Sequence, residues 1–275
     1  MTSVLALTLL LAGPAPAKGI HWEKSFDEAM DLARKHDKPV LVGFRTEWSG
    51  LSRRLDRTTW VEPLVAARAK DFIAVTVDAE GSRRELEVVR TYNVRNVPTI
   101  LFLSPRGRQL TRVDGFEGPG RFPHTMDKAL ETARRIGPWE EALERDPTDA
   151  AALFALGVHL WNQKCYGDSH DLLARAAVHD ANRPPQERRQ TRLLLAILQN
   201  AQRQYAEAES MIKEALSLDP TAPDQPDLLF VLGRTYVSWG RHEEGVQTMQ
   251  VIVREYSQSP MAQKARETLF NLEKK

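Results

Sequence analysis

The sequence contains a single cysteine, Cys165, among its 275 residues. An intramolecular disulfide needs two thiols, so none can form within the chain. Thiol-disulfide exchange needs an attacking thiolate and a second thiol that resolves the mixed disulfide, so an internal dithiol reaction is excluded. A lone thiol is most often a small buried hydrophobe, and an intermolecular disulfide through Cys165 is the alternative.

The sequence also lacks an excess of charge of either sign. Lys and Arg number 38, Asp and Glu number 37, and the formal net charge is +1. This leaves no strong field to attract nucleic acid or an anionic membrane, so we predict no nucleic-acid partner. The histidines are scattered without a His-x-x-x-His pair or a Cys/His cluster, and there is no glycine-rich phosphate loop. We therefore predict no metal site and no cofactor.

Long apolar runs are absent beyond the first residues. No later segment has the length to span a bilayer, so we expect no transmembrane segment in the mature chain. Residues 1–17 resemble a secretory signal peptide, with an apolar run from Val4 to Ala12 and a small-x-small end at Ala15-Pro16-Ala17. No Lys or Arg precedes that run. We expect an exported protein, periplasmic or secreted.

Residues 20–136 alternate between helical and strand patterns. Ser25 and Glu28 have the spacing of a capping box, which predicts a helix to about His36. Pro39 ends that helix because the residue before a proline is disfavoured in the α region. Strands are predicted at 40–44, 72–78, 99–103 and 109–116, and further helices at 53–59, 61–70, 83–92 and 121–136. This order predicts an α/β sandwich with a mixed sheet.

From residue 137 only helical periodicity remains. A repeat appears at Leu156-Gly157, Leu195-Ala196 and Leu232-Gly233, spaced 39 and 37 residues apart. Residues 138–275 resemble tetratricopeptide repeats, which have a period of roughly 34 residues. Residues 139–147 are interpreted as the second helix of an incomplete repeat, and 261–272 as a terminal capping helix.

The α/β unit has further motifs in a characteristic order. They are Lys38–Val42, Trp48–Ser52, Val77-Asp78, Tyr92–Val94, Val97–Thr99, and Gly107 before Gly115. Together they resemble the thioredoxin family. Ser49 and Ser52 stand where that family carries its two cysteines, and Gly43 stands where it commonly has a buried acid. A hydroxyl is far less acidic than a thiol and cannot form a disulfide, so the domain is predicted to be redox-inactive.

The resemblance implies a groove for an extended peptide. In the family, a proline matching Pro98 takes a cis peptide bond opposite the active-site turn, and the backbone before it pairs with the peptide. The residues assigned to this groove are Trp48, Ser49, Ser52, Val97 and Pro98. A purely structural role for Pro98 in the turn stays open. No histidine lies near the turn in sequence, so we predict no catalytic residue and interpret Ser49 as a helix cap.

Tetratricopeptide stacks bind extended peptides or helices on the concave face, which is lined by the first helix of each repeat. The repeat register predicts a partner-binding set on that face: Phe154, Val158, Trp161, Asn162, Leu193, Ile197, Asn200, Phe230, Arg234 and Val237. Packing of some of these side chains against neighbouring helices is the alternative.

These patterns predict a non-catalytic protein-binding or scaffold protein of the bacterial cell envelope, with a protein or extended peptide as partner. Two other functions stay open. One is an enzyme related to thiol-disulfide oxidoreductases that acts through Cys165 or a partner's thiol. The other is a chaperone-like holdase.

Overall fold

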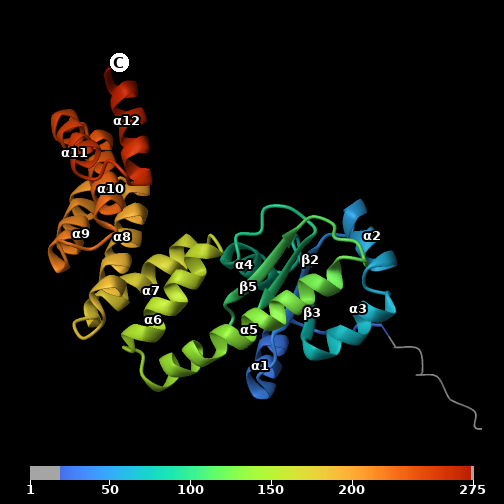
Figure 1. Ribbon diagram of the computed structural model, residues 1–275. Coiled ribbons are helices and arrows are strands. Elements are labelled where there is room, and N and C mark those ends of the chain that lie inside the picture. Colours follow the sequence, from blue (N-terminus) through green and yellow to red (C-terminus); the bar gives the residue numbers. More distant parts are fainter. Residues whose placement is uncertain (1–18, 274–275) are drawn as a thin grey trace, which may run out of the picture. The chain divides into compact units, whose positions relative to one another are not determined.

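The computed structural model describes residues 19–273, so the predicted signal peptide at 1–17 lies outside the described residues. The chain divides into two compact units at Gly137 and Pro138 (Figure 1). Within residues 19–273, no helix combines the length and apolar character needed to cross a bilayer.

The first unit is built on a five-stranded mixed sheet of order β1-β3-β2-β4-β5. Its strands are β1 (Trp22–Glu23), β2 (Val40–Arg45), β3 (Ile73–Asp78), β4 (Thr99–Leu103) and β5 (Gln109–Asp114). Strand β3 runs parallel to β1 and β2, and β4 runs antiparallel to β2 and β5. The short edge strand β1 was not predicted, because two residues carry no periodicity. The other four strands were predicted.

Helices cover both faces of this sheet, as the sandwich prediction required. They are α1 (Phe26–His36), α2 (Gly50–Thr58), α3 (Pro63–Arg68), a 3₁₀ turn η1 (Ala69–Asp71), α4 (Arg83–Thr91) and α5 (Phe122–Arg145). On one face, Met30 of α1 and Val88 of α4 belong to a core cluster with Val42 and Phe44 of β2. On the other, Phe122 of α5 lies with its ring centroid 5.9 Å from that of Phe102 in β4.

Two helix caps differ from the prediction. Ser25 caps α1 by accepting a hydrogen bond from the Glu28 amide at 3.2 Å. The complete reciprocal capping box instead opens α4, where Ser82 Oγ accepts from the Glu85 amide and Glu85 Oε2 accepts from the Ser82 amide. The other oxygen, Glu85 Oε1, accepts from the Asp78 amide at 3.0 Å. Glu85 thus fixes both ends of the loop between β3 and α4.

Helix α5 corrects the predicted break near residue 137. It is one helix from Phe122 to Arg145, with Pro138 inside it. A proline inside a helix donates no amide hydrogen bond, and its ring crowds the carbonyl of the residue four positions earlier. Pro138 and Arg134 are both exposed, so water can hydrate the Arg134 carbonyl. Ile136 and Glu140, on either side of Pro138 in the sequence, are buried.

The second unit is a series of helix pairs, as the repeats predicted. The pairs are α6 (Ala150–Asn162) with α7 (Tyr166–His179), α8 (Pro185–Ala201) with α9 (Tyr205–Leu218), and α10 (Gln225–Ser238) with α11 (His242–Glu255), followed by α12 (Pro260–Glu273). A Cβ at Gly157 would lie 2.9 Å from Leu173, and one at Gly233 would lie 2.8 Å from Met249. Ala196 is fully buried at the matching place. The repeated small residues therefore mark where paired helices approach most closely.

A buried ionic cluster, which the sequence patterns did not reveal, joins α8 to the following helices. Arg189 is 1% exposed and donates to Asp224, to Gln225, and to the backbone carbonyls of Ala215 and Asp219. The shortest distance to each of these four acceptors lies between 2.6 and 2.8 Å. The guanidinium therefore supplies donors to carbonyls near the end of α9 that receive no amide from within the helix.

Glu209 of α9 makes the second unit sensitive to acid. Burial alone would raise the pKa of Glu209, but hydrogen bonds from Lys213, Tyr236 and Arg241 outweigh it and lower the pKa from 4.5 to about 2. The unfolded chain therefore binds this proton first as the pH falls. The stabilisation, on the order of 2 kcal/mol after solvent screening, is present above about pH 4.5 and is lost as the pH falls towards 2.

We expect Glu209→Gln to lower the free energy of unfolding by about 2 kcal/mol at pH 7 and by little near pH 2. Urea unfolding of both proteins across this pH range measures the difference. Glu207→Gln, an exposed change on the same helix, is the control. An equal loss for Glu209→Gln at both pH values would contradict the assigned protonation of Glu209.

Candidate functional site

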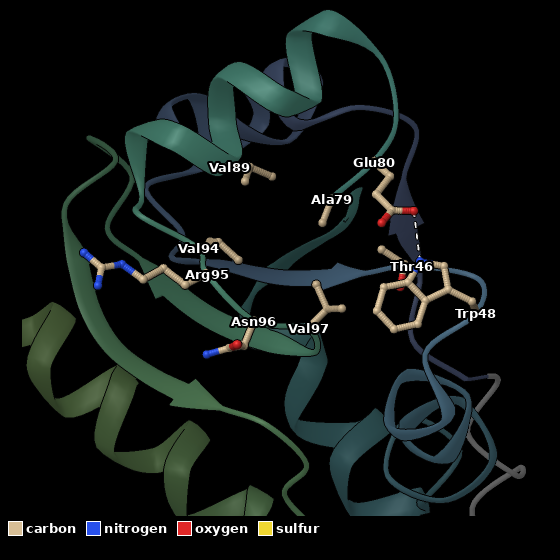
Figure 2. A pocket seen from close by; sticks show the side chains of 9 residues that line it. All are labelled: Thr46, Trp48, Ala79, Glu80, Val89, Val94, Arg95, Asn96 and Val97. Atoms are coloured by element: carbon tan, nitrogen blue, oxygen red, sulfur yellow. Dashed lines mark hydrogen bonds between the residues drawn. The ribbon is translucent and has the colours of Figure 1, made fainter.

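The turn between β2 and α2 presents Trp48 to solvent and buries the two serines. Trp48 is 65% exposed, and its Nε1 donates to Glu80 Oε2 at 2.9 Å (Figure 2). Ser49 caps α2, because its Oγ accepts from the Ser52 amide at 3.2 Å, which confirms the predicted cap. Ser52 Oγ is buried and has no hydrogen-bond partner among residues 19–273.

The peptide bond between Val97 and Pro98 is cis, as the family resemblance implied. The antiparallel pairing of β4 with β2 begins at Thr99, opposite Phe44, so Val97 lies just outside the sheet. Within the described part of the chain, no group hydrogen-bonds to the amide or the carbonyl of Val97. Beside the turn, Val97 therefore has a backbone donor and a backbone acceptor without a partner in this part of the chain.

A pocket of about 330 Å³ lies between Trp48 and Val97. It is lined by Thr46, Trp48, Ala79, Glu80, Val89, Val94, Arg95, Asn96 and Val97 (Figure 2). Four of these side chains are apolar and aliphatic, and two are charged. The pocket joins Trp48 and Val97 from the predicted groove. Ser49, Ser52 and Pro98 are buried beside it and do not line it.

Most of the pocket was missed by the sequence patterns. Ala79 and Glu80 come from the loop after β3, and Val94 to Asn96 come from the loop after α4. The complete capping box at Ser82 and Glu85 was the one local signal that the first loop is fixed in place.

Aromatic rings cover the place where the family commonly has an acid. A Cβ at Gly43 would lie 3.9 to 4.0 Å from Thr76, Trp22 and Trp60. The rings of Trp22 and Trp60 meet edge to face, with centroids 5.4 Å apart. An ionised carboxylate among these rings would be costly, so the surroundings of Gly43 agree with the loss of the two cysteines.

The predicted partner-binding residues of the second unit have mixed placements. Phe154, Val158 and Trp161 are half-buried against a core of Leu173, Leu194 and Leu195, and Leu193 and Phe230 pack against neighbouring cores. Asn162 and Arg234 are exposed, and Ile197 and Val237 are half-buried. Asn200 donates to Thr235 Oγ1 at 2.8 Å. Packing within the repeats therefore buries part of the surface of five of the predicted side chains. They are Phe154, Val158, Trp161, Leu193 and Phe230.

Cys165 is half-buried and immediately precedes α7 in the second unit, whereas the pocket belongs to the first. Among residues 19–273, no group of three or more His, Cys, Asp or Glu side chains is arranged to hold a metal ion.

Comparison with known protein families agrees with this architecture. Residues 21–105 match a thioredoxin-like family model, and residues 139–187 and 199–269 match tetratricopeptide-repeat models. The chain therefore carries a thioredoxin-like domain without the cysteine pair, followed by tetratricopeptide repeats.

Individual relatives are distant. The thiol:disulfide interchange protein DsbD of Vibrio vulnificus is 26% identical over 96 residues, which is 34% of this chain and 16% of the relative. The DsbD of Ralstonia nicotianae is 26% identical over 132 residues, 45% of this chain and 22% of the relative. The chain thus spans about a sixth to a fifth of the length of these curated relatives. Among solved structures, a DsbH oxidoreductase is 22% identical with a TM-score of 0.41, covering 46% of this chain and 95% of its own.

Proposed function

We propose that this protein binds extended polypeptide through its thioredoxin-like domain without catalysing thiol-disulfide exchange. The observation that carries the proposal is the pocket between Trp48 and the unpaired backbone of Val97, beside a turn whose cysteine positions hold Ser49 and Ser52. Backbone groups without a partner, such as those of Val97, can pair with an extended chain, and a neighbouring pocket gives selectivity for its side chains.

The tetratricopeptide repeats support a protein partner, since such repeats commonly present extended binding surfaces. We place the protein in the bacterial cell envelope as a binding or scaffold component. This placement draws on the signal-like residues 1–17 and on the similarity to thiol:disulfide interchange proteins, whose chemistry the serine pair cannot perform.

We expect Trp48→Ala to weaken binding of extended peptides by about tenfold, because an exposed Trp beside a pocket is typical of a binding hot spot. Fluorescence polarisation of a labelled random peptide library with the full chain measures the change. Trp239→Ala is the matched control, since Trp239 is a partly exposed tryptophan of the second unit. If both variants bind the peptides as tightly as the wild type, Trp48 does not contribute to binding, and the proposal that the peptide binds in this groove is wrong.

A further inference from the structure

The pocket has an apolar interior with the volume of a small ligand site. Ala79, Val89, Val94 and Val97 form its aliphatic lining. Its volume of about 330 Å³ lies at the lower end of the range for ligand sites, which starts near roughly 300 Å³. This is room for one side chain of an extended peptide, and burial of such a side chain is favourable by roughly 0.8 kcal/mol for each CH₂.

Two unlike charges stand on opposite sides of this interior. Figure 2 shows Glu80 beside Trp48 and Arg95 on the far side of Val97. Both residues are exposed. One oxygen of Glu80 accepts from Trp48, and Nε of Arg95 donates to Asn93 Oδ1 at 3.1 Å. Neither charge forms an ion pair with any residue in the range 19–273, so each is available to an opposite charge on a ligand.

The hydroxyl of Thr46 adds an independent sign of a ligand. Thr46 lines the pocket and is 2% exposed, yet its Oγ1 has no hydrogen-bond partner among the described residues. Buried polar groups are nearly always hydrogen-bonded, and leaving one unpaired is costly. A peptide carbonyl or amide in the pocket would supply the missing partner.

From these three observations we infer that the pocket selects peptides with an apolar residue between a basic and an acidic residue, and that it distinguishes the order of the two charges. The apolar side chain enters the pocket, the basic residue faces Glu80, and the acidic residue faces Arg95. This inference rests on the proposed function, because it concerns the same groove.

Two labelled peptides of identical composition test the charge order, one with Lys-Ser-Leu-Ser-Glu and one with Glu-Ser-Leu-Ser-Lys at its centre, because side chains two residues apart lie on the same side of an extended chain. The full-length wild type should bind one order about fivefold more tightly at low salt. Reversing the order replaces two attractive contacts between exposed charges by two repulsive ones. The preference should shrink at about 0.5 M salt, where exposed charges are screened. The double variant Glu80→Arg/Arg95→Glu should prefer the other order by a similar factor.

Two further variants keep the test independent of folding defects. Glu80→Gln retains an oxygen acceptor for Trp48 and should reduce the preference, and Thr46→Val should weaken both peptides by a similar factor of about five. The control Asp31→Arg/Arg34→Asp exchanges an exposed ion pair on α1 and should leave the preference unchanged.

The outcomes separate the two proposals. Equal binding of both orders, or a preference that the Glu80→Arg/Arg95→Glu variant does not reverse, would overturn the charge-order inference while the groove remains a peptide site. If the wild type binds neither these peptides nor a random library, the proposed function itself fails.

Discussion

Replacing Arg189 by alanine is expected to lower the free energy of unfolding of the second unit by about 3 to 5 kcal/mol, the cost of removing one partner from a buried charged cluster. Asp224, Gln225 and two carbonyls near the end of α9 would each lose a donor. Asp224 is partly exposed, so water can replace some of its loss. The effect should approach the lower end of this range.

Urea unfolding of the full chain, followed by hydrogen exchange, measures and localises the change. Amides of α8, α9 and α10 should exchange faster, while those of the first unit keep their protection. Arg189→Lys keeps the charge but cannot reach all of these acceptors, so it should lose an intermediate amount. Arg254→Ala removes an exposed arginine of the same unit and should change stability by less than about 0.5 kcal/mol. A loss below about 1 kcal/mol for Arg189→Ala would mean that solvent already satisfies these groups.

Arg189 also shows what sequence patterns cannot predict. Arginine is rarely fully buried, so helical periodicity places it on the solvent side. Its partners Asp224 and Gln225 lie 35 and 36 residues away, at the start of the next repeat. Only the stacking of repeats brings them together, and no local pattern contains that information. The helices themselves follow from apolar spacing and from the small residues Gly157 and Gly233, and those were predicted.

In the candidate site, too, some residues were predicted from sequence motifs and others were not. Trp48, Ser49 and Val97 were found because they lie in motifs of fixed order around β2 and β4. Glu80 and Arg95 were missed because they lie in loops, where the direction of a side chain depends on turn geometry and on distant caps such as Glu85. The family resemblance therefore predicted that Trp48 and Val97 lie close together, whereas the charges of Glu80 and Arg95 beside them appear only in the fold.

Introducing two cysteines, in Ser49→Cys/Ser52→Cys, is expected to raise insulin reduction in the presence of dithiothreitol by about tenfold or more over the wild type. The wild type itself should not exceed the uncatalysed background. Ser49 caps α2, and a thiolate in its place would accept the same amide hydrogen bond at the positive end of the helix. The pKa of that thiol would therefore fall below that of a free thiol, and the thiol introduced in place of Ser52 would resolve the mixed disulfide.

The single variants Ser49→Cys and Ser52→Cys are the matched controls, since each lacks one of the two required thiols. The double and single cysteine variants should all carry Cys165→Ala, so that the native thiol cannot substitute for an introduced one, and the wild type is measured both with Cys165 and as Cys165→Ala. The gain should stay below that of a complete thioredoxin-type site, because Gly43 supplies no acid and Trp22 and Trp60 cover its surroundings. The two introduced thiols could form a disulfide while insulin reduction stays at the level of the single variants. That result would mean that the absence of the two cysteines is not the only reason for the lack of activity. Turnover by the wild type with Cys165 intact, and not by Cys165→Ala, would instead establish the oxidoreductase alternative.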